Sequence, residues 1–243
     1  MQKEKDNWYT AWFNTPYYHL LYKDRNHREA AFFMNQLINY LKLKKNDSIL
    51  DLACGKGRHS KYLFRQGFEV TGVDLSKESI EHAKQYEKPG LHFEVHDMCL
   101  PYPQQFDAVF NLFTSFGYFE NEIDNFRTIK AIKEELKPTG YAVIDFLNVE
   151  LAIKNLIPSE KKKVGKIEFN IEKQFNDGYI LKNISFEDEG KKYFYEERVK
   201  ALTLEDFEFY FKEANITLKN VFGDYNLNEF DRNTSERLIL IFN

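Results

Sequence analysis

The stretch Ile49-Leu-Asp-Leu-Ala-Cys-Gly-Lys-Gly57 decides which fold this chain is expected to adopt. Its first part is short and apolar, which predicts a buried strand over 48–52. Its second part is rich in glycine, and a helix is expected from Arg58 onward, with Gly67 as its stop. Glycines at such a place let backbone N–H groups come close to a ligand where a helix begins. The stretch therefore predicts a strand, a ligand-binding turn and a helix in succession.

Outward from this stretch, expected strands and helices alternate along the chain. Further strands are predicted at 68–73, 91–95, 106–112 and 141–146, and helices at 26–43, 58–66, 76–87 and 121–136. A helix at 204–214 and two strands at 216–222 and 237–242 follow later. This alternation predicts an α/β fold with a mostly parallel sheet that carries helices on both faces. Right-handed crossovers then place the carboxyl ends of the strands, and the ligand, at one edge.

Residues 151–200 do not follow this alternation. Apolar and polar residues alternate along two runs, 167–171 and 180–186, and Asn176-Asp-Gly178 between them is a hairpin signal. A third strand is expected at 193–199. The sequence therefore predicts a small antiparallel β-meander inserted after the fifth strand.

Composition limits the classes of protein that this chain can represent. Its 243 residues, 43% hydrophobic and 30% charged, fit one folded domain. The net charge of -4 gives no general attraction for nucleic acid or anionic lipid, and Lys161–Lys163 is expected to be a solvated loop. Cys54 and Cys99 suggest neither a disulfide framework nor a zinc site, so no metal is predicted.

The amino-terminal residues predict a location. They are charged, with no apolar stretch of a signal peptide behind them. No apolar run approaches the roughly 20 residues that span a bilayer. We therefore expect a cytoplasmic protein without a membrane partner, present as a monomer or homodimer.

Three acidic residues stand where the predicted strands end. Asp51, just ahead of the glycines, is expected to lie under the ligand, where it can hold an ammonium group but would repel a pyrophosphate. Asp74 ends the second strand, where an acidic side chain accepts hydrogen bonds from ribose hydroxyls; the alternative is that it helps to start the next helix. Asp97 ends the third strand and is either an adenine-binding residue, with Met98 packed on the ring, or an ordinary strand-end aspartate.

Together these segments resemble the successive motifs of class I S-adenosylmethionine-dependent methyltransferases. The motifs are Asp51-x-Ala-x-Gly-x-Gly57, Val73-Asp-Leu-Ser76, His96-Asp-Met98 and Phe106-Asp-Ala-Val-Phe-Asn111. The resemblance covers residues 47–148 well and departs at Ala53, where the family usually has a glycine. It implies a Rossmann-like, mostly parallel seven-stranded sheet with an antiparallel terminal strand.

The resemblance also implies S-adenosylmethionine as the cofactor. Gly55 and Gly57 would cradle the methionine moiety, and Asn111 and Leu112 would border the site of methyl transfer. The complete set of implied cofactor contacts is Asp51, Ala53, Cys54, Gly55, Gly57, Arg58, Asp74, Leu75, Ser76, Asp97, Met98, Asn111 and Leu112. Of these, Arg58 either meets the cofactor's carboxylate or is a solvated first-turn residue, and Cys54 is expected to be a small spacer.

The resemblance also divides the chain into parts. We expect one domain over 1–243, made of an N-terminal lid and helix at 1–45, a cofactor-binding core at 46–148, the β-meander at 151–200, and a return to the core sheet at 201–243. The aromatic segment 12–22 either folds over the cofactor as a lid or simply packs on a sheet edge. Within it, Tyr17, Tyr18 and His19 are candidates to orient or deprotonate the methyl acceptor.

The segment 111–119 bears on the acceptor. It lacks the Asn/Asp-Pro-Pro-aromatic run of nucleic-acid amino methyltransferases, which disfavours a nucleic-acid partner. With the meander, it resembles small-molecule N-methyltransferases, including those that act on amino sugars. The expected partner is thus a small-molecule methyl acceptor with a nitrogen or oxygen nucleophile.

Three other functions stay open from the sequence. An NAD(P)-dependent oxidoreductase predicts a third glycine where this chain has Ser60. A non-catalytic S-adenosylmethionine-binding module and an RNA or protein methyltransferase also fit the motifs. The sequence shows no obvious set of catalytic residues. This does not argue against an enzyme, because alignment of the two reactants can supply a large part of the rate enhancement.

Overall fold

The computed structural model describes residues 12–22, 27–119 and 121–243. The chain divides into two compact units, each formed by two separate segments. The smaller unit comprises Met1–Arg25 and Ala152–Ala201, and the larger one Asn26–Leu151 and Leu202–Asn243.

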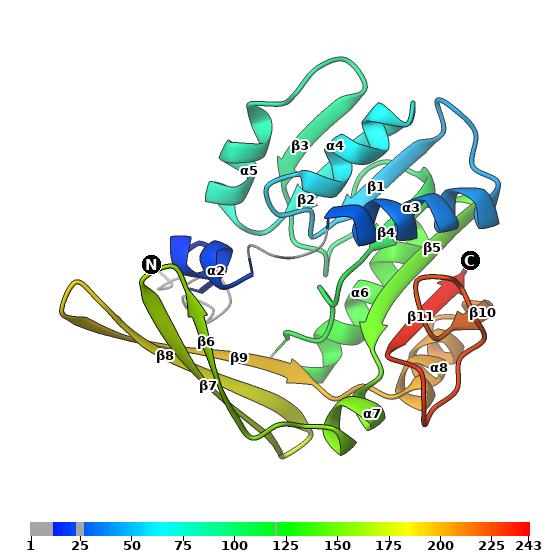
Figure 1. Ribbon diagram of the computed structural model, residues 1–243. Helices are drawn as coiled ribbons and strands as arrows, with labels where there is room; N and C mark the ends of the chain where they lie inside the picture. The colour runs from blue at the N-terminus through cyan, green and yellow to red at the C-terminus, as the bar shows by residue number, and fades with distance from the viewer. Residues whose placement is uncertain (1–11, 23–26, 120) are drawn as a thin grey trace, which may run out of the picture. The chain divides into compact units, whose positions relative to one another are not determined.

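The larger unit is built on a seven-stranded sheet (Figure 1). Its strands are β1 (Ser48–Leu52), β2 (Glu69–Asp74), β3 (Leu91–Val95), β4 (Phe106–Asn111), β5 (Leu136–Leu147), β10 (Leu218–Phe222) and β11 (Arg237–Phe242). They lie in the order β10-β11-β5-β4-β1-β2-β3. Strand β11 is antiparallel to both of its neighbours, whereas the pairs from β5 to β3 are parallel. The predicted sheet, with its antiparallel terminal strand, is confirmed.

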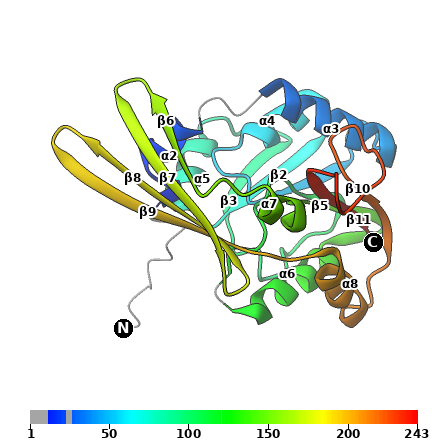
Figure 2. The same ribbon diagram turned by 60° about the horizontal axis from the view of Figure 1, so that its bottom comes forward.

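Helices cover both faces of this sheet. On one face are α3 (His27–Leu41), α4 (Arg58–Arg65) and α5 (Lys77–Lys84), whose apolar side chains form one buried cluster with the strands. On the other face are α6 (Glu122–Glu134) and α8 (Leu204–Glu213), as Figure 2 shows. There the Phe211 and Phe242 rings lie 4.6 Å apart. The layered α/β architecture follows the prediction.

Strand β1 lies at the centre of the sheet, and its position explains its sequence. All five of its residues are buried, because β2 and β4 pair with its two edges and helices cover its faces. A strand buried on both faces is apolar throughout and does not alternate. Asp51 is the charged exception, so it requires a polar partner inside the fold.

The smaller unit is a four-stranded antiparallel sheet with α2 (Pro16–Leu21) packed on it. Its strands are β6 (Ser159–Val164), β7 (Ile167–Asn176), β8 (Tyr179–Asp188) and β9 (Lys191–Lys200), in sequence order. Trp12 and Leu21 join Phe169, Ile184 and Phe186 in one buried cluster. The hairpin predicted at Asn176-Asp-Gly178 is present, with Asp177 and Gly178 both at positive φ.

Several sequence-based boundaries are wrong. Lys161–Lys163 lie in strand β6 and not in a loop, because they pair with β7 and because Lys162 Nζ donates to Leu21 O at 2.9 Å. Helix α7 (Val149–Lys154) was not expected. Strand β5 begins at Leu136, ahead of the predicted start, since Leu136 pairs with Phe106 across a register shift. Residues 8–11 of the aromatic lead-in lie outside the described part of the chain.

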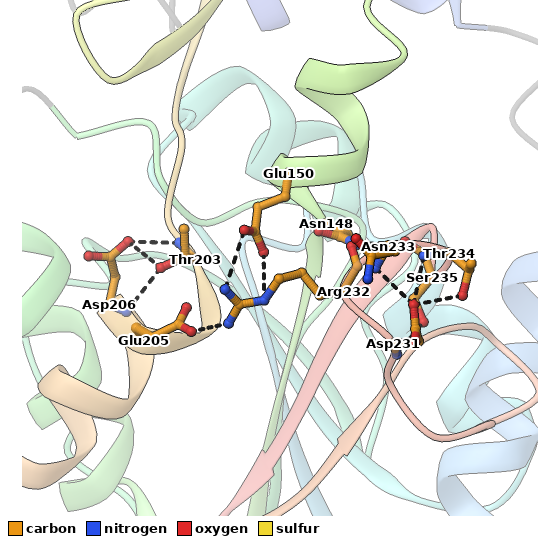
Figure 3. Close-up of polar contacts among 10 residues, drawn as sticks. All are labelled: Asn148, Glu150, Thr203, Glu205, Asp206, Asp231, Arg232, Asn233, Thr234 and Ser235. Atoms are coloured by element: carbon orange, nitrogen blue, oxygen red, sulfur yellow. Dashed lines mark hydrogen bonds and ion pairs between the residues drawn. The ribbon is translucent and has the colours of Figure 1, made fainter.

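The chain leaves the larger unit after Leu151 and returns to it at Leu202. Close to these two points Arg232 forms ion pairs with Glu150, at 3.2 Å, and with Glu205 (Figure 3). Asn148 Nδ2 donates to the carbonyl oxygen of Arg232 at 2.9 Å. The loop between β10 and β11 therefore contacts residues of the larger unit that lie a few positions from both crossing points. In the described part of the chain no helix is long and apolar enough to cross a membrane.

Candidate functional site

The glycine-rich turn after β1 has the backbone that its sequence suggests. Ala53, Gly55 and Gly57 have φ values of 65°, 55° and 72°, in the left-handed region that favours glycine. Cys54 N donates to Val73 O at 2.9 Å, and this bond fixes the turn to the end of β2. Ala53 adopts a conformation that glycine accommodates more easily, so an alanine at this position costs about 1 kcal/mol.

The two glycines of the turn have different surroundings. A Cβ on Gly57 would lie 2.5 Å from the Phe93 ring, so close packing against β3 requires glycine there. A Cβ on Gly55 would meet nothing within 4 Å. Gly57 therefore serves the packing of the fold, whereas the space beside Gly55 is open.

Asp51 finds its polar partner in Ser60 of α4. The Ser60 hydroxyl donates to Asp51 Oδ2 at 2.5 Å, and both residues are buried. A Cβ on Gly72, which pairs with Asp51 across β1 and β2, would lie 2.7 Å from the Ser60 hydroxyl, so Gly72 makes room for this contact. Burial raises the pKa of Asp51 to about 6, and the Ser60 hydrogen bonds oppose that rise. Near neutral pH this carboxylate is ionised, beside the turn.

Asp74 connects the turn to the next helix. Its Oδ2 accepts from Gly55 N at 2.8 Å, and its Oδ1 accepts from Ser76 N at 2.9 Å. Ser76 in turn caps α5 by accepting from Ser79 N. Burial raises the pKa of Asp74, and the two backbone hydrogen bonds oppose the rise. These bonds show the alternative role of Asp74, at the helix start, and they use only part of the acceptor capacity of a carboxylate. The expected ribose contact stays a prediction, as does a contact from Leu75.

The ends of β1, β3 and β4 meet at Asn111. Its fully buried amide donates to Leu52 O at 3.1 Å and lies 3.8 Å from Met98 Sδ. The amide oxygen of Asn111 has no hydrogen-bond partner among the described residues. Asp97 Oδ1 accepts from Cys99 N at 2.9 Å. With the bond from Gly55 to Asp74, these contacts bring the three predicted cofactor segments together at one edge of the sheet.

Other predicted contact residues lie around the turn. Arg58 Nη2 lies 2.6 Å from His59 Nε2, and the His59 ring lies 4.6 Å from the Phe113 ring. Cys54 is buried, and burial raises the pKa of its thiol well above the ordinary value. A thiol in this state is a poor nucleophile, as expected of a small spacer. Leu112 is also buried.

A buried ion pair close to Asn111 and Leu112 was missed by the sequence reasoning. Arg237 Nε donates to Asp145 Oδ1 at 2.8 Å, and the aspartate is 0% exposed. The same two residues bind the backbone and side chain of Phe113 and Thr114. A single acidic residue inside the apolar strand 141–146 was the available signal, because a buried carboxylate needs a cation nearby.

The three candidate catalytic residues belong to the smaller unit. Tyr17 donates its hydroxyl proton to Asp188 Oδ2 at 2.9 Å, and its ring packs against Phe186. Tyr18 and His19 have ring centroids 5.4 Å apart. Hydrogen bonding with Tyr193 and burial raise the pKa of Tyr17, which disfavours its phenolate as a base. The catalytic roles of Tyr17, Tyr18 and His19 stay predictions. Within the described ranges no cluster of His, Cys, Asp and Glu side chains is suited to hold a metal ion.

Comparison with known proteins agrees with this arrangement. Residues 49–140 match the family model of a methyltransferase domain. The chain is 38% identical to the Bacillus subtilis protein YqeM over 107 residues, which are 42% of this chain and 43% of YqeM. It is 30% identical over 100 residues to the dTDP-3-amino-3,4,6-trideoxy-alpha-D-glucopyranose N,N-dimethyltransferase of Streptomyces venezuelae, covering 40% of this chain and 41% of that one. The matched stretch thus spans less than half the length of either relative.

Solved structures share the fold over nearly the whole chain. An S-adenosylmethionine-dependent methyltransferase from Clostridium acetobutylicum superposes with a TM-score of 0.78 at 23% identity, covering 93% of this chain and 95% of that one. At this identity the likeness shows the fold alone. The match to the family model thus covers the stretch 49–140, whereas the fold of S-adenosylmethionine-dependent methyltransferases extends over nearly the whole chain. The matched stretch contains the glycine turn, Asp74, Asp97 and Asn111.

The same geometry argues against the oxidoreductase. A dinucleotide-binding sheet has six parallel strands and a third glycine that lets the helix pack closely on the strand. This chain has the antiparallel strand β11, and it has Ser60 in place of that glycine, hydrogen-bonded to Asp51. A fixed carboxylate at this position would repel a pyrophosphate.

Proposed function

We propose that this chain is an enzyme that transfers a methyl group from S-adenosylmethionine to a small-molecule acceptor. The observation that supports this most directly is the meeting of the glycine turn, Asp74 and the Met98–Asn111 contact at the carboxyl ends of neighbouring strands. An amino acid joined to a nucleoside needs such a set of donors and acceptors along one edge.

The residues at this edge fit that cofactor. Gly55 leaves the space that a bound methionine moiety needs, because no atom lies where its Cβ would be. Asp51, ionised above about pH 6, favours an ammonium group nearby. The Asp74 carboxylate has lone pairs left for ribose hydroxyls, and the unpartnered amide oxygen of Asn111 can accept a hydrogen bond.

The protein's part in the reaction is chiefly alignment. The sulfonium cofactor supplies an activated methyl group when bound. Leu112 and the following residues would border that group and hold the acceptor in line with it, which can contribute roughly 7–11 kcal/mol by proximity and orientation. A neutral amine acceptor then needs little help from a base, whereas a hydroxyl acceptor needs one, and Tyr17, Tyr18 and His19 are the candidates.

We propose an amine, of the amino-sugar kind, as the acceptor. One relative is named as an N,N-dimethyltransferase of a dTDP-linked amino sugar. The net charge of -4 argues against a nucleic-acid acceptor. A monomeric or homodimeric state is part of the proposal, and light scattering after size-exclusion chromatography tests it.

The test has two steps that separate the competing functions. Calorimetry measures binding of S-adenosylhomocysteine and, for comparison, of NADH. The expected result is a dissociation constant in the micromolar range for S-adenosylhomocysteine and no binding of NADH. Transfer of radioactive methyl groups is then measured with dTDP-linked amino sugars, amino acids, phenols and transfer RNA. Binding of the cofactor with no transfer to any of them would favour the non-catalytic module, and transfer to RNA alone would contradict the small-molecule acceptor.

A further inference from the structure

A strained backbone turn directly follows Asn111 and Leu112. Phe113 and Thr114 both adopt the left-handed conformation, with φ of 60° and 59°. Neither residue is glycine, and threonine is rare in this region because its β-branched side chain crowds the backbone. Such a conformation persists only where the surrounding structure fixes it, and it is found preferentially at functional sites.

Two residues from neighbouring strands fix this turn. Asp145 of β5 accepts from Phe113 N through Oδ2 at 2.8 Å and from Thr114 N through its backbone oxygen at 3.0 Å. Arg237 of β11 donates from Nη2 to the Thr114 hydroxyl at 2.9 Å. Both backbone N–H groups of the turn and one of its side chains are therefore bound by this pair.

The pair itself is buried and charged. Arg237 and Asp145 also bind each other, with Nη2 and Oδ1 at 2.7 Å, and their exposed side-chain fractions are 18% and 0%. A buried ion pair contributes little to stability compared with apolar residues of the same volume, because both charges lose their hydration. Apolar residues, however, would offer the turn no donor or acceptor. The ion pair forms hydrogen bonds with Phe113 and Thr114, which an apolar pair could not form.

The turn also lies between two other parts of the larger unit. The Phe113 ring lies 4.6 Å from the ring of His59, in the first turn of α4, and 5.8 Å from that of Tyr225. Tyr225 donates its hydroxyl proton to Asp145 Oδ2 at 3.4 Å. A shift of the turn would therefore disturb the helix that begins at the glycine turn as well as the segment 115–119.

We propose that Arg237 and Asp145 are positioning residues for the methyl acceptor. They hold the Phe113-Thr114 turn so that Leu112 and the segment 115–119 present a fixed edge to the acceptor. The inference rests on the proposed function, and it adds a role that neither the motifs nor the family likeness assigns. Neither residue touches the reacting atoms.

A matched pair of variants at Thr114 tests this role without breaking the ion pair. Thr114→Val keeps the β-branched shape and removes the hydroxyl that accepts from Arg237, whereas Thr114→Ser keeps the hydroxyl. Three quantities are measured: kcat and KM for the acceptor that the wild type methylates, the dissociation constant of S-adenosylhomocysteine, and amide hydrogen exchange of residues 112–119.

For Thr114→Val we expect kcat to fall about tenfold and amide exchange at the turn to rise about tenfold, the size of effect that one lost hydrogen bond produces. Affinity for S-adenosylhomocysteine should change less than about threefold, because the cofactor contacts lie elsewhere. Thr114→Ser should return all three quantities to near the wild-type values. A merely structural role would lower cofactor affinity and turnover together.

Arg237→Lys provides a second variant, since one ammonium group cannot bridge Asp145 and Thr114 as a guanidinium does. It should move the three quantities in the same direction. Lys137→Met is the control, because it removes the Lys137–Asp107 ion pair near the amino-terminal ends of β4 and β5 and should leave all three unchanged. Unchanged exchange at the turn in both Thr114→Val and Arg237→Lys would overturn the inference. A wild type that binds the cofactor but methylates nothing would defeat the proposed function instead, and exchange would still show whether the pair holds the turn.

Discussion

Ser60 shows how a single side chain holds a buried carboxylate in place beside a glycine turn. At this position a dinucleotide-binding fold has a glycine, which lets the helix pack closely on the strand. Here Ser60 donates to Asp51, and the missing side chain of Gly72 leaves the space for it. The result is a buried carboxylate, held in place, whose charge favours a cationic ligand. This arrangement depends on three residues, Ser60, Asp51 and Gly72, that meet across two strands and a helix.

The two turn glycines should respond differently to alanine. Gly57→Ala should lower the free energy of unfolding by roughly 3 kcal/mol, because the new methyl group collides with the Phe93 ring and the left-handed backbone is strained as well. Gly55→Ala should cost only about 1 kcal/mol, for the backbone alone, yet weaken S-adenosylhomocysteine binding more. Urea unfolding and calorimetry on both variants check this. Equal losses of stability would contradict the distinct roles.

Cofactor affinity should depend on the ionisation of Asp51. Its pKa of about 6 means that the carboxylate is protonated as the pH falls through 6, and its attraction for an ammonium group is then lost. We expect affinity for S-adenosylmethionine to fall about tenfold between pH 7.5 and pH 5, and Asp51→Asn to remove most of this dependence. Calorimetry at several pH values measures it. Asp107→Asn, near the amino-terminal end of β4, is the control and should behave as the wild type; a wild-type affinity that is flat with pH would contradict the role of Asp51.

At the scale of elements, strand β11 brings together residues that are far apart in the chain. It pairs antiparallel with β5, and this pairing places Arg237 beside Asp145, 92 residues earlier. The β4–β5 pairing places the turn after β4 within reach of the same aspartate. Each strand can be predicted from its apolar run. The Arg237–Asp145 ion pair, however, forms only because β11 lies next to β5 in the sheet.

Glu135, which caps the end of α6, is another buried acid, and its burial has a consequence for stability. Glu135 is fully buried, accepts from Tyr102 N at 3.0 Å, and has a pKa raised by burial to about 7. Between about pH 4.5 and 7 the folded chain holds a proton that the unfolded chain has released, so stability falls as the pH rises through this window and is level above it.

Glu135→Gln should remove this part of the pH dependence. The variant should then exceed the wild type in free energy of unfolding by about 3 kcal/mol at pH 8 and match it near pH 4. Glu134→Gln, at an exposed neighbour, is the matched control and should change stability by a few tenths of a kcal/mol. Urea unfolding across the pH range measures all three proteins. A Glu135→Gln variant less stable than the wild type at pH 8 would contradict the raised pKa.

At the scale of the whole molecule, two segments far apart in sequence build the smaller unit. Trp12 is fully buried against the four-stranded sheet, and its indole N–H donates to Glu197 at 2.7 Å. Tyr22 donates to the same carboxylate. The segment 12–22 therefore packs on the four-stranded sheet as part of the core of this unit. Its role as a lid over the cofactor stays a prediction. The chain crosses between the units where Arg232 pairs with Glu150 and Glu205 (Figure 3), and these exposed pairs contribute little to stability.

Deleting residues 1–22 should affect the two units unequally. The loss of Trp12 and Leu21 opens the buried cluster around Phe169 and Phe186, so amide exchange in β7 and β8 should rise by at least about tenfold. Methyl transfer should be lost, while S-adenosylhomocysteine should bind within about threefold of the wild type, because the cofactor residues belong to the larger unit. Hydrogen exchange and calorimetry check this. Full activity in the truncated protein would contradict any role of the segment at the acceptor.

The sequence by itself determined the sheet, its helices and the edge where the glycine turn and the strand-end acids meet. These features depend on local signals: apolar runs, glycines after a strand and acids at strand ends. Only the tertiary structure decided the rest. It placed Ser60 under Asp51, Arg237 beside Asp145 and the lysines 161–163 in a strand, since each of these contacts joins residues whose nearness depends on strand order and register. A periodic pattern shows which side of an element is buried, but not which charged group lies opposite it.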